Sequence, residues 1–166
     1  MVCKYCDVTN EDESFITESE HWRVFLSYDQ CYVGHCLIVA KRHVRDLNEL
    51  NEGEIKDLFN LIKKLEQVMK DAFDATMFNV SCLMNDCYNT MNRNDSVQRT
   101  ENLVFSSVKP VDPHVYFNLR PRYAKRVDLG LIFDDPEFGF HYSSSRTREV
   151  SDKIKKEIMT KIKSCL

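Results

Sequence analysis

The sequence has few glycines and prolines, no long apolar run and no excess of basic residues. Its 166 residues include 4 glycines and 4 prolines, which excludes a collagen-like or low-complexity chain. The longest apolar runs are a few residues, such as 37–40, whereas a membrane helix needs about 20. No apolar segment of a secretory signal peptide follows residues 1–6. The composition and the short apolar runs predict a soluble globular protein with no membrane partner, and the net charge of −3 argues against dedicated nucleic-acid binding.

The hydrophobic pattern predicts one α+β domain over residues 1–166. A long helix is expected from about Gly53 to Phe73, capped by Asn51 and Glu54, and a second helix near the C-terminus, at about 150–165. The apolar stripe of the long helix is expected to face the core, and it comprises Ile55, Leu58, Phe59, Ile62, Leu65 and Met69. Strands are predicted at 22–28, 36–40, 77–83 and 114–120. Strands on both sides of the long helix favour an antiparallel sheet, and the polar stretch 88–112 is predicted to be a long surface loop.

The 7 cysteines are numerous for a chain with no predicted signal peptide, so we expect a cytoplasmic protein whose thiols stay free or bind metal. Five are interpreted as small buried residues: Cys31, Cys36, Cys82, Cys87 and Cys165. Cys3 and Cys6 form a C-x-x-C, which fits a redox pair, half of a zinc site, or chance. A redox pair would need a preceding strand. The spacing alone provides no further zinc ligands.

The segment 114–120 alternates strictly between apolar and polar residues. In a strand, Val115, Phe117 and Leu119 would therefore face the core together. The opposite face would carry a chemically varied row, about 6.6 Å apart, of His114, Tyr116, Asn118 and Arg120. Four cations follow within seven positions: Arg120, Arg122, Lys125 and Arg126. A plain surface strand would also show this alternation, but the cations favour a phosphate-bearing ligand, with Arg120 and Arg122 as binding residues.

Residues 34–44 (GHCLIVAKRHV) and 113–122 (PHVYFNLRPR) resemble the two signature regions of the histidine-triad (HIT) superfamily. The resemblance implies a HIT-like fold, with an antiparallel sheet, one long helix and a C-terminal helix. It further implies a homodimer that binds nucleotides or dinucleoside polyphosphates. Many members of the superfamily hydrolyse or transfer nucleoside monophosphate groups.

The triad itself departs from the pattern of the superfamily. The first histidine is His114, but the second position is Tyr116 and the third is Asn118. In the superfamily the second histidine attacks the α-phosphorus, whereas a tyrosine hydroxyl with an ordinary pKa near 10 is protonated at pH 7. We therefore expect reduced or absent catalysis. Two alternatives remain open: an active enzyme with non-standard residues, aided by His35, and a non-enzymatic interaction module on the same scaffold.

The resemblance also implies further site residues. Zinc-containing members use positions that correspond here to Cys3, Cys6, His43 and His114, and four protein ligands would make that zinc structural. Asn85 matches a polar position near the bound phosphate, and Ser27 matches the position of a ribose-binding acid. His35 matches a position near the triad, although an interior histidine with a hydrogen-bond partner would have the same signature.

Overall fold

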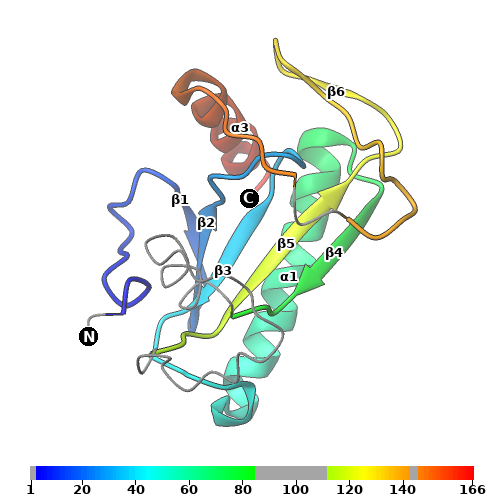
Figure 1. The fold of residues 1–166 in the computed structure, drawn as a ribbon. Helices are drawn as coiled ribbons and strands as arrows, with labels where there is room; N and C mark the ends of the chain where they lie inside the picture. The colour runs from blue at the N-terminus through cyan, green and yellow to red at the C-terminus, as the bar shows by residue number, and fades with distance from the viewer. Residues whose placement is uncertain (1–2, 85–111, 143–145) are drawn as a thin grey trace, which may run out of the picture.

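The computed structural model describes residues 3–84, 112–142 and 146–166. Within these ranges the chain forms a five-stranded sheet in the order β1-β2-β3-β5-β4, and each neighbouring pair is antiparallel (Figure 1). Its strands are β1 (Phe15–Glu18), β2 (Trp22–Leu26), β3 (Cys36–Ala40), β4 (Met77–Ser81) and β5 (Tyr116–Arg122). The predicted α+β class with an antiparallel sheet is confirmed.

The long helix α1 (Glu52–Phe73) packs along one face of the sheet (Figure 1). Its predicted cap is confirmed: the Asn51 side chain accepts the Glu54 N–H at 2.9 Å, and the Glu54 carboxylate accepts the Asn51 N–H at 2.9 Å. The predicted stripe is wrong at two positions, because Ile55 and Phe59 are 41% and 60% exposed. Leu61 and Val68 are buried instead, so the core-facing side of α1 is rotated from the predicted one.

The second helix α3 (Asp152–Ser164) lies beside α1 and β1. Its buried side carries Ile154, Ile158 and Ile162, which join the main core. A single turn of 3-10 helix, η1 (Leu47–Glu49), precedes α1. In the described residues, no helix has the length and the apolar composition needed to cross a membrane.

The alternation of β5 places its side chains in two different hydrophobic clusters. Phe117 and Leu119 pack in or against the main core under α1. Tyr116 belongs to a smaller cluster with Phe25 and Val39, against which Tyr5 of the N-terminal segment packs. The face opposite α1 is therefore covered in part by the N-terminal segment, and this face carries the side chains of the predicted site.

Several strand boundaries differ from the predicted ones. β5 begins and ends two residues later than expected, since Val115 instead exchanges backbone hydrogen bonds with Val44 and Ala40 outside the strand. β1 was not predicted. It has only four residues, which is too short for a clear alternation of apolar and polar side chains. The ribbon of β6 (Val127–Asp128) and β7 (Ile132–Phe133) was also not predicted; it turns at Gly130, whose φ of +70° suits glycine.

Candidate metal centre and binding cleft

Four metal-ligating side chains from distant parts of the chain meet beside the start of β5. The ligand atoms of Cys3, Cys6, His43 and His114 all lie within 4.8 Å of one another. The His114 Nδ1 atom is 3.4 Å from Cys3 Sγ and 3.7 Å from Cys6 Sγ, and Cys6 Sγ is 3.2 Å from His43 Nδ1. In a tetrahedral site, bonds of about 2.3 Å to sulfur and about 2.0 Å to nitrogen place such atoms about 3.6 Å apart. The four side chains thus have the spacing of a tetrahedral ligand set.

The outer contacts of both histidines orient Nδ1 toward the cluster. His114 Nε2 lies 2.9 Å from the Ala40 carbonyl oxygen, which can only accept, so the ring donates from Nε2 and keeps a lone pair on Nδ1. His43 Nε2 lies 3.1 Å from a carboxylate oxygen of Asp112, which also accepts from Arg45 Nε at 2.8 Å. This pairing of a ligating histidine with a carbonyl or carboxylate is usual around protein-bound metals.

Protonation in the cluster depends on the charge that it holds. Desolvation lowers the pKa of His114, which favours the neutral ring that can ligate a metal. Desolvation and the neighbouring Cys3 raise the pKa of the Cys6 thiol to about 11 in the absence of a cation. A bound divalent cation would reverse that effect, because its charge stabilises the thiolate. The cluster can therefore hold a divalent metal ion and would release protons on binding it.

Two of the predicted site residues, His35 and Asn118, are in contact with each other and are both buried. His35 Nε2 lies 3.1 Å from Asn118 Oδ1, and His35 Nδ1 lies 3.0 Å from the Asp29 carbonyl oxygen. The His35 ring is only 2% exposed, and burial, followed by the charge of Arg120, lowers its pKa to about 4. His35 is therefore a neutral interior residue at pH 7 that holds Asn118 in place.

The candidate nucleophile position, Tyr116, is almost completely covered. Tyr116 is 5% exposed, and the ring of Tyr5 lies over it with centroids 4.9 Å apart. Tyr5 stands between Cys3 and Cys6 in the sequence, so the same short segment supplies two members of the cluster and the cover of Tyr116. The group of Cys3, Cys6, His43 and His114 is therefore a direct neighbour of Tyr116.

A cleft of about 950 Å³ opens on this face of the sheet. Its floor is formed by Phe25, Leu37 and Val39 of β2 and β3, and its two walls are the N-terminal segment and α3. Ser27, at the end of β2, is the predicted nucleotide-binding residue that lines it, and its hydroxyl oxygen accepts the Asp29 N–H at 3.2 Å. The cleft thus combines an apolar floor with polar walls, as small-molecule sites commonly do.

Arg120 lies farther along β5 on the same face as Asn118. Its guanidinium carbon is 4.6 Å from the centre of the Tyr142 ring, and its Nη1 atom is buried with no hydrogen-bond partner among the described residues. A buried cationic donor of this kind has capacity for an anionic ligand. Asn85, Cys87 and most of the predicted loop 88–112 lie outside the described residues.

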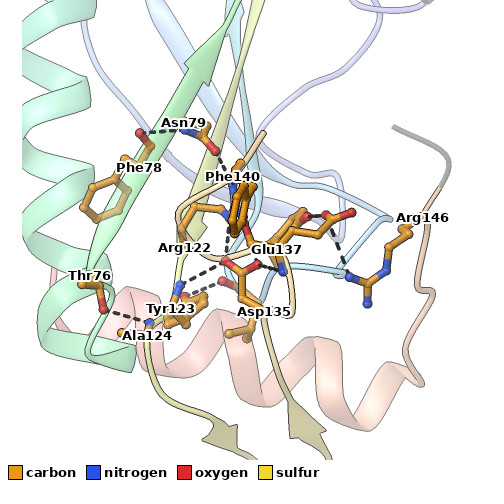
Figure 2. Close-up of polar contacts among 12 residues, drawn as sticks. Thr76, Phe78, Asn79, Arg122, Tyr123, Ala124, Asp135, Glu137, Phe140 and Arg146 are labelled. Carbon is orange, nitrogen blue, oxygen red and sulfur yellow. Dashed lines mark hydrogen bonds and ion pairs between the residues drawn. The ribbon is translucent and has the colours of Figure 1, made fainter. Parts of the chain in front are cut away.

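The prediction that Arg122 binds phosphate must be corrected. Its guanidinium is fully buried and forms two hydrogen bonds with Asp135, at 2.6 and 2.9 Å (Figure 2). It also donates to Asn79 Oδ1 and to the backbone carbonyls of Glu137 and Phe140. Its guanidinium N–H groups are already hydrogen-bonded within the protein. Arg122 therefore connects β5 to the segment after β7 instead of binding a ligand.

Sequence reasoning missed several residues of this region. Tyr5 was not singled out, although it lies between Cys3 and Cys6 in the sequence and its ring contacts the ring of Tyr116. Lys155 and Lys156 were not predicted as site residues, yet they line the cleft. No local pattern distinguishes them from the other lysines of α3, so only the packing of the helix reveals their position.

The family model named HIT domain matches residues 8–102. Among curated proteins, the chain is 24% identical to the Protein hit of Bacillus subtilis over 133 residues, which covers 79% of this chain and 78% of the relative. It is 32% identical to the asymmetrical bis(5'-nucleosyl)-tetraphosphatase of Schizosaccharomyces pombe over 56 residues, covering 34% of this chain and 31% of that protein.

Solved structures show the same fold. A hypothetical histidine triad nucleotide-binding protein of Sulfolobus tokodaii superposes with a TM-score of 0.62 at 17% identity, covering 98% of this chain and 91% of the other. A Zn-bound histidine triad family protein of Mycobacterium smegmatis superposes with a TM-score of 0.51 at 14% identity, covering 91% and 81%. At these identities the likeness concerns the fold alone.

Proposed function

Because the HIT domain model covers residues 8–102, this chain belongs to the HIT family, and we propose on that premise that it binds a nucleotide or dinucleoside polyphosphate. The cleft beside Tyr116 supports the proposal, since its apolar floor suits a base and its polar walls suit sugar and phosphate. The similarity to a bis(5'-nucleosyl)-tetraphosphatase supports the same class of ligand. Ser27 is the proposed contact for the sugar, and Arg120, Asn118 and Asn85 are the proposed contacts for one phosphate group of the ligand.

In this proposal the protein binds nucleotides, and its catalytic activity is reduced or absent. The observation that carries this proposal is Tyr116: a phenol stands at the nucleophile position, 5% exposed, under the ring of Tyr5. A tyrosine hydroxyl is a weak nucleophile unless a base activates it. Asn118 cannot accept and return a proton, and His35 is enclosed beneath it. The alternatives, an active hydrolase or transferase and a non-enzymatic interaction module, are outcomes of the test below.

We also propose that Cys3, Cys6, His43 and His114 hold a structural zinc ion. Interatomic distances of 3.2 to 3.7 Å and the fixed Nδ1 lone pairs support this assignment. Zinc would supply a positive charge that joins the N-terminal segment to the central sheet, and four protein ligands leave no open position for catalysis. Such a pair of thiolates needs a reducing compartment, which fits a cytoplasmic protein.

A homodimer is the proposed assembly. Several apolar side chains are exposed, among them Ile55 and Phe59 of α1, Val80 of β4, and Leu83. In the part of the chain that the structure describes, β4 pairs only with β5, so its other edge is available for a partner. Light scattering on the purified protein would give twice the chain mass of 19.6 kDa.

The test of function separates binding from turnover. Calorimetry should detect binding of ATP or diadenosine tetraphosphate, and chromatography after long incubation with diadenosine polyphosphates and adenosine phosphoramidate should detect no product. Turnover that disappears in Tyr116→Phe or His35→Ala would instead establish an active enzyme with non-standard residues. Absence of any nucleotide binding would favour the interaction module. Hydrolysis gained in the double variant Tyr116→His/Asn118→His would support phosphate binding at this face.

A further inference from the structure

Helix α3 contributes one wall of the cleft, although it lies outside residues 8–102 that match the HIT domain. Its cleft-lining residues are Asp152, Lys155, Lys156 and Met159. Their spacing of three, four and seven residues places them on one side of a helix, away from the buried isoleucines. Ser27, the residue directly after β2, lines the same cleft as these four residues. The helix therefore presents two cations to the cleft.

The charges on the α3 wall are only partly neutralised. Lys155 Nζ lies 3.5 Å from Asp152 Oδ1, an ion pair between residues on the same helix. Lys156 has no ion-pair partner within the described residues. Water weakens the attraction between exposed charges, so this ion pair is weak and Lys155 can still bind another anion. The α3 wall therefore has a surplus of one positive charge.

The opposite wall of the cleft has more acidic than basic side chains. It carries Lys4, Asp12 and Glu13. Asp12 is engaged locally, since its carboxylate accepts the Ser14 N–H at 2.8 Å, and Lys4 Nζ lies 4.8 Å from the centre of the Tyr5 ring. Glu13 thus adds a carboxylate where an anionic ligand group would be repelled. Within this cleft, a phosphate group would therefore lie nearer α3 than the opposite wall, and a flat apolar group would lie on Phe25 and Val39.

We propose that Lys155 and Lys156 determine ligand specificity in this cleft by binding a second phosphate group, in addition to the one proposed for Arg120 and Asn118, so that phosphorylated nucleosides bind and neutral nucleosides bind poorly. The inference rests on the proposed nucleotide-binding function and names the part of the chain that selects the charged ligand. Long lysine stems suit this role, because the methylene groups pack along the cleft wall while the ammonium group reaches the ligand.

The test compares two double variants that remove the same charge. Lys155→Gln/Lys156→Gln changes the cleft wall, and Lys153→Gln/Lys163→Gln changes exposed lysines of α3 that do not line the cleft. Glutamine keeps the helix propensity and most of the stem. Calorimetry with ATP should show an affinity about tenfold lower for the cleft variant only, with adenosine binding equal in all three proteins.

The outcomes separate the two proposals. If the wild-type protein binds neither ATP nor diadenosine tetraphosphate, the proposed function is overturned, and the inference falls with it. If the wild-type protein binds ATP but the two double variants bind it equally well, or lose affinity equally, the role of Lys155 and Lys156 is overturned while nucleotide binding stands. A lower affinity of the cleft variant for both ATP and adenosine would also overturn the inference, because it would indicate lost packing instead of lost charge recognition.

Discussion

His35 is a residue whose chemistry is set by burial more than by its own side chain. The ring is 2% exposed between the Asp29 carbonyl and the Asn118 carboxamide, and loss of solvent is the main reason that its pKa falls to about 4. The guanidinium of Arg120 lowers that pKa further. An imidazole in this state positions a neighbour and stays uncharged at neutral pH.

The lowered pKa of His35 predicts a pH-dependent stability. The unfolded histidine titrates near pH 6.5 and the folded one near pH 4, so the unfolded state binds more protons between these values. The stability is therefore fully present above pH 6.5 and is lost as the pH falls toward 4. The expected loss is about 3 kcal/mol. Urea unfolding at several pH values, compared between the wild type and His35→Gln, would measure it.

The pH dependence of stability sums the contributions of all titratable groups, so the difference between the two proteins is the informative quantity. In His35→Gln, the free energy of unfolding should fall less steeply from pH 6.5 to pH 4. Parallel curves for the two proteins would show that His35 is not the group responsible.

At the scale of secondary-structure elements, the ion pair of Arg122 and Asp135 joins β5 to the segment that follows β7. Both side chains are 0% exposed, and the two hydrogen bonds between them are supplemented by contacts to Asn79 and to backbone carbonyls (Figure 2). A buried charge that loses its partner is costly, because the low-dielectric interior does not solvate it. This contact therefore stabilises the arrangement of the C-terminal half.

We expect Arg122→Met to lower the free energy of unfolding by about 3–5 kcal/mol, because Asp135 stays buried without its partner. Lys125→Met is the matched control: it breaks an ion pair with Asp74 in which both side chains are more than 80% exposed, 84% and 83%. That change should cost less than about 1 kcal/mol. Denaturant unfolding of both variants measures the difference, and equal small effects would contradict the structural role of Arg122.

At the scale of the whole molecule, the metal cluster connects segments that are distant in the sequence. Cys3 and His114 are separated by 111 positions, and Cys6 and His43 by 37. The cluster thereby fixes the N-terminal segment against the central sheet, and this segment carries Lys4 and Tyr5, which line the cleft. Metal binding at this cluster would therefore be coupled to the cover of Tyr116 and to the shape of the cleft through these few residues.

Removal of the metal should therefore affect both stability and ligand binding. Cys3→Ser, or treatment with a strong chelator, should release about one zinc ion per chain, lower the melting temperature, and weaken ATP binding. Cys165→Ser is the matched control, since Cys165 packs at the end of α3, away from the cluster. Elemental analysis and thermal unfolding would check this. An unchanged metal content in Cys3→Ser would refute the ligand assignment.

Local features of this fold could be predicted from the sequence. The cap of α1 depends on Asn51 and Glu54, three residues apart, and the two faces of β5 follow from alternation, so neighbouring residues carry the information. The boundaries of β3 agree with the prediction for the same reason. The grouping of Cys3, Cys6, His43 and His114 came from the family resemblance, because nothing in their spacing along the chain brings them together.

The remaining features depend on contacts between distant segments. The sequence predicted that Arg122 binds a ligand, but its guanidinium instead binds Asp135 and the backbone carbonyl of Glu137. The placement of Tyr5 over Tyr116 and of Lys155 and Lys156 in the cleft likewise follows from packing across the sheet. Periodicity states which side of an element is apolar, whereas the neighbour that each polar side chain meets is set by how the elements pack in three dimensions.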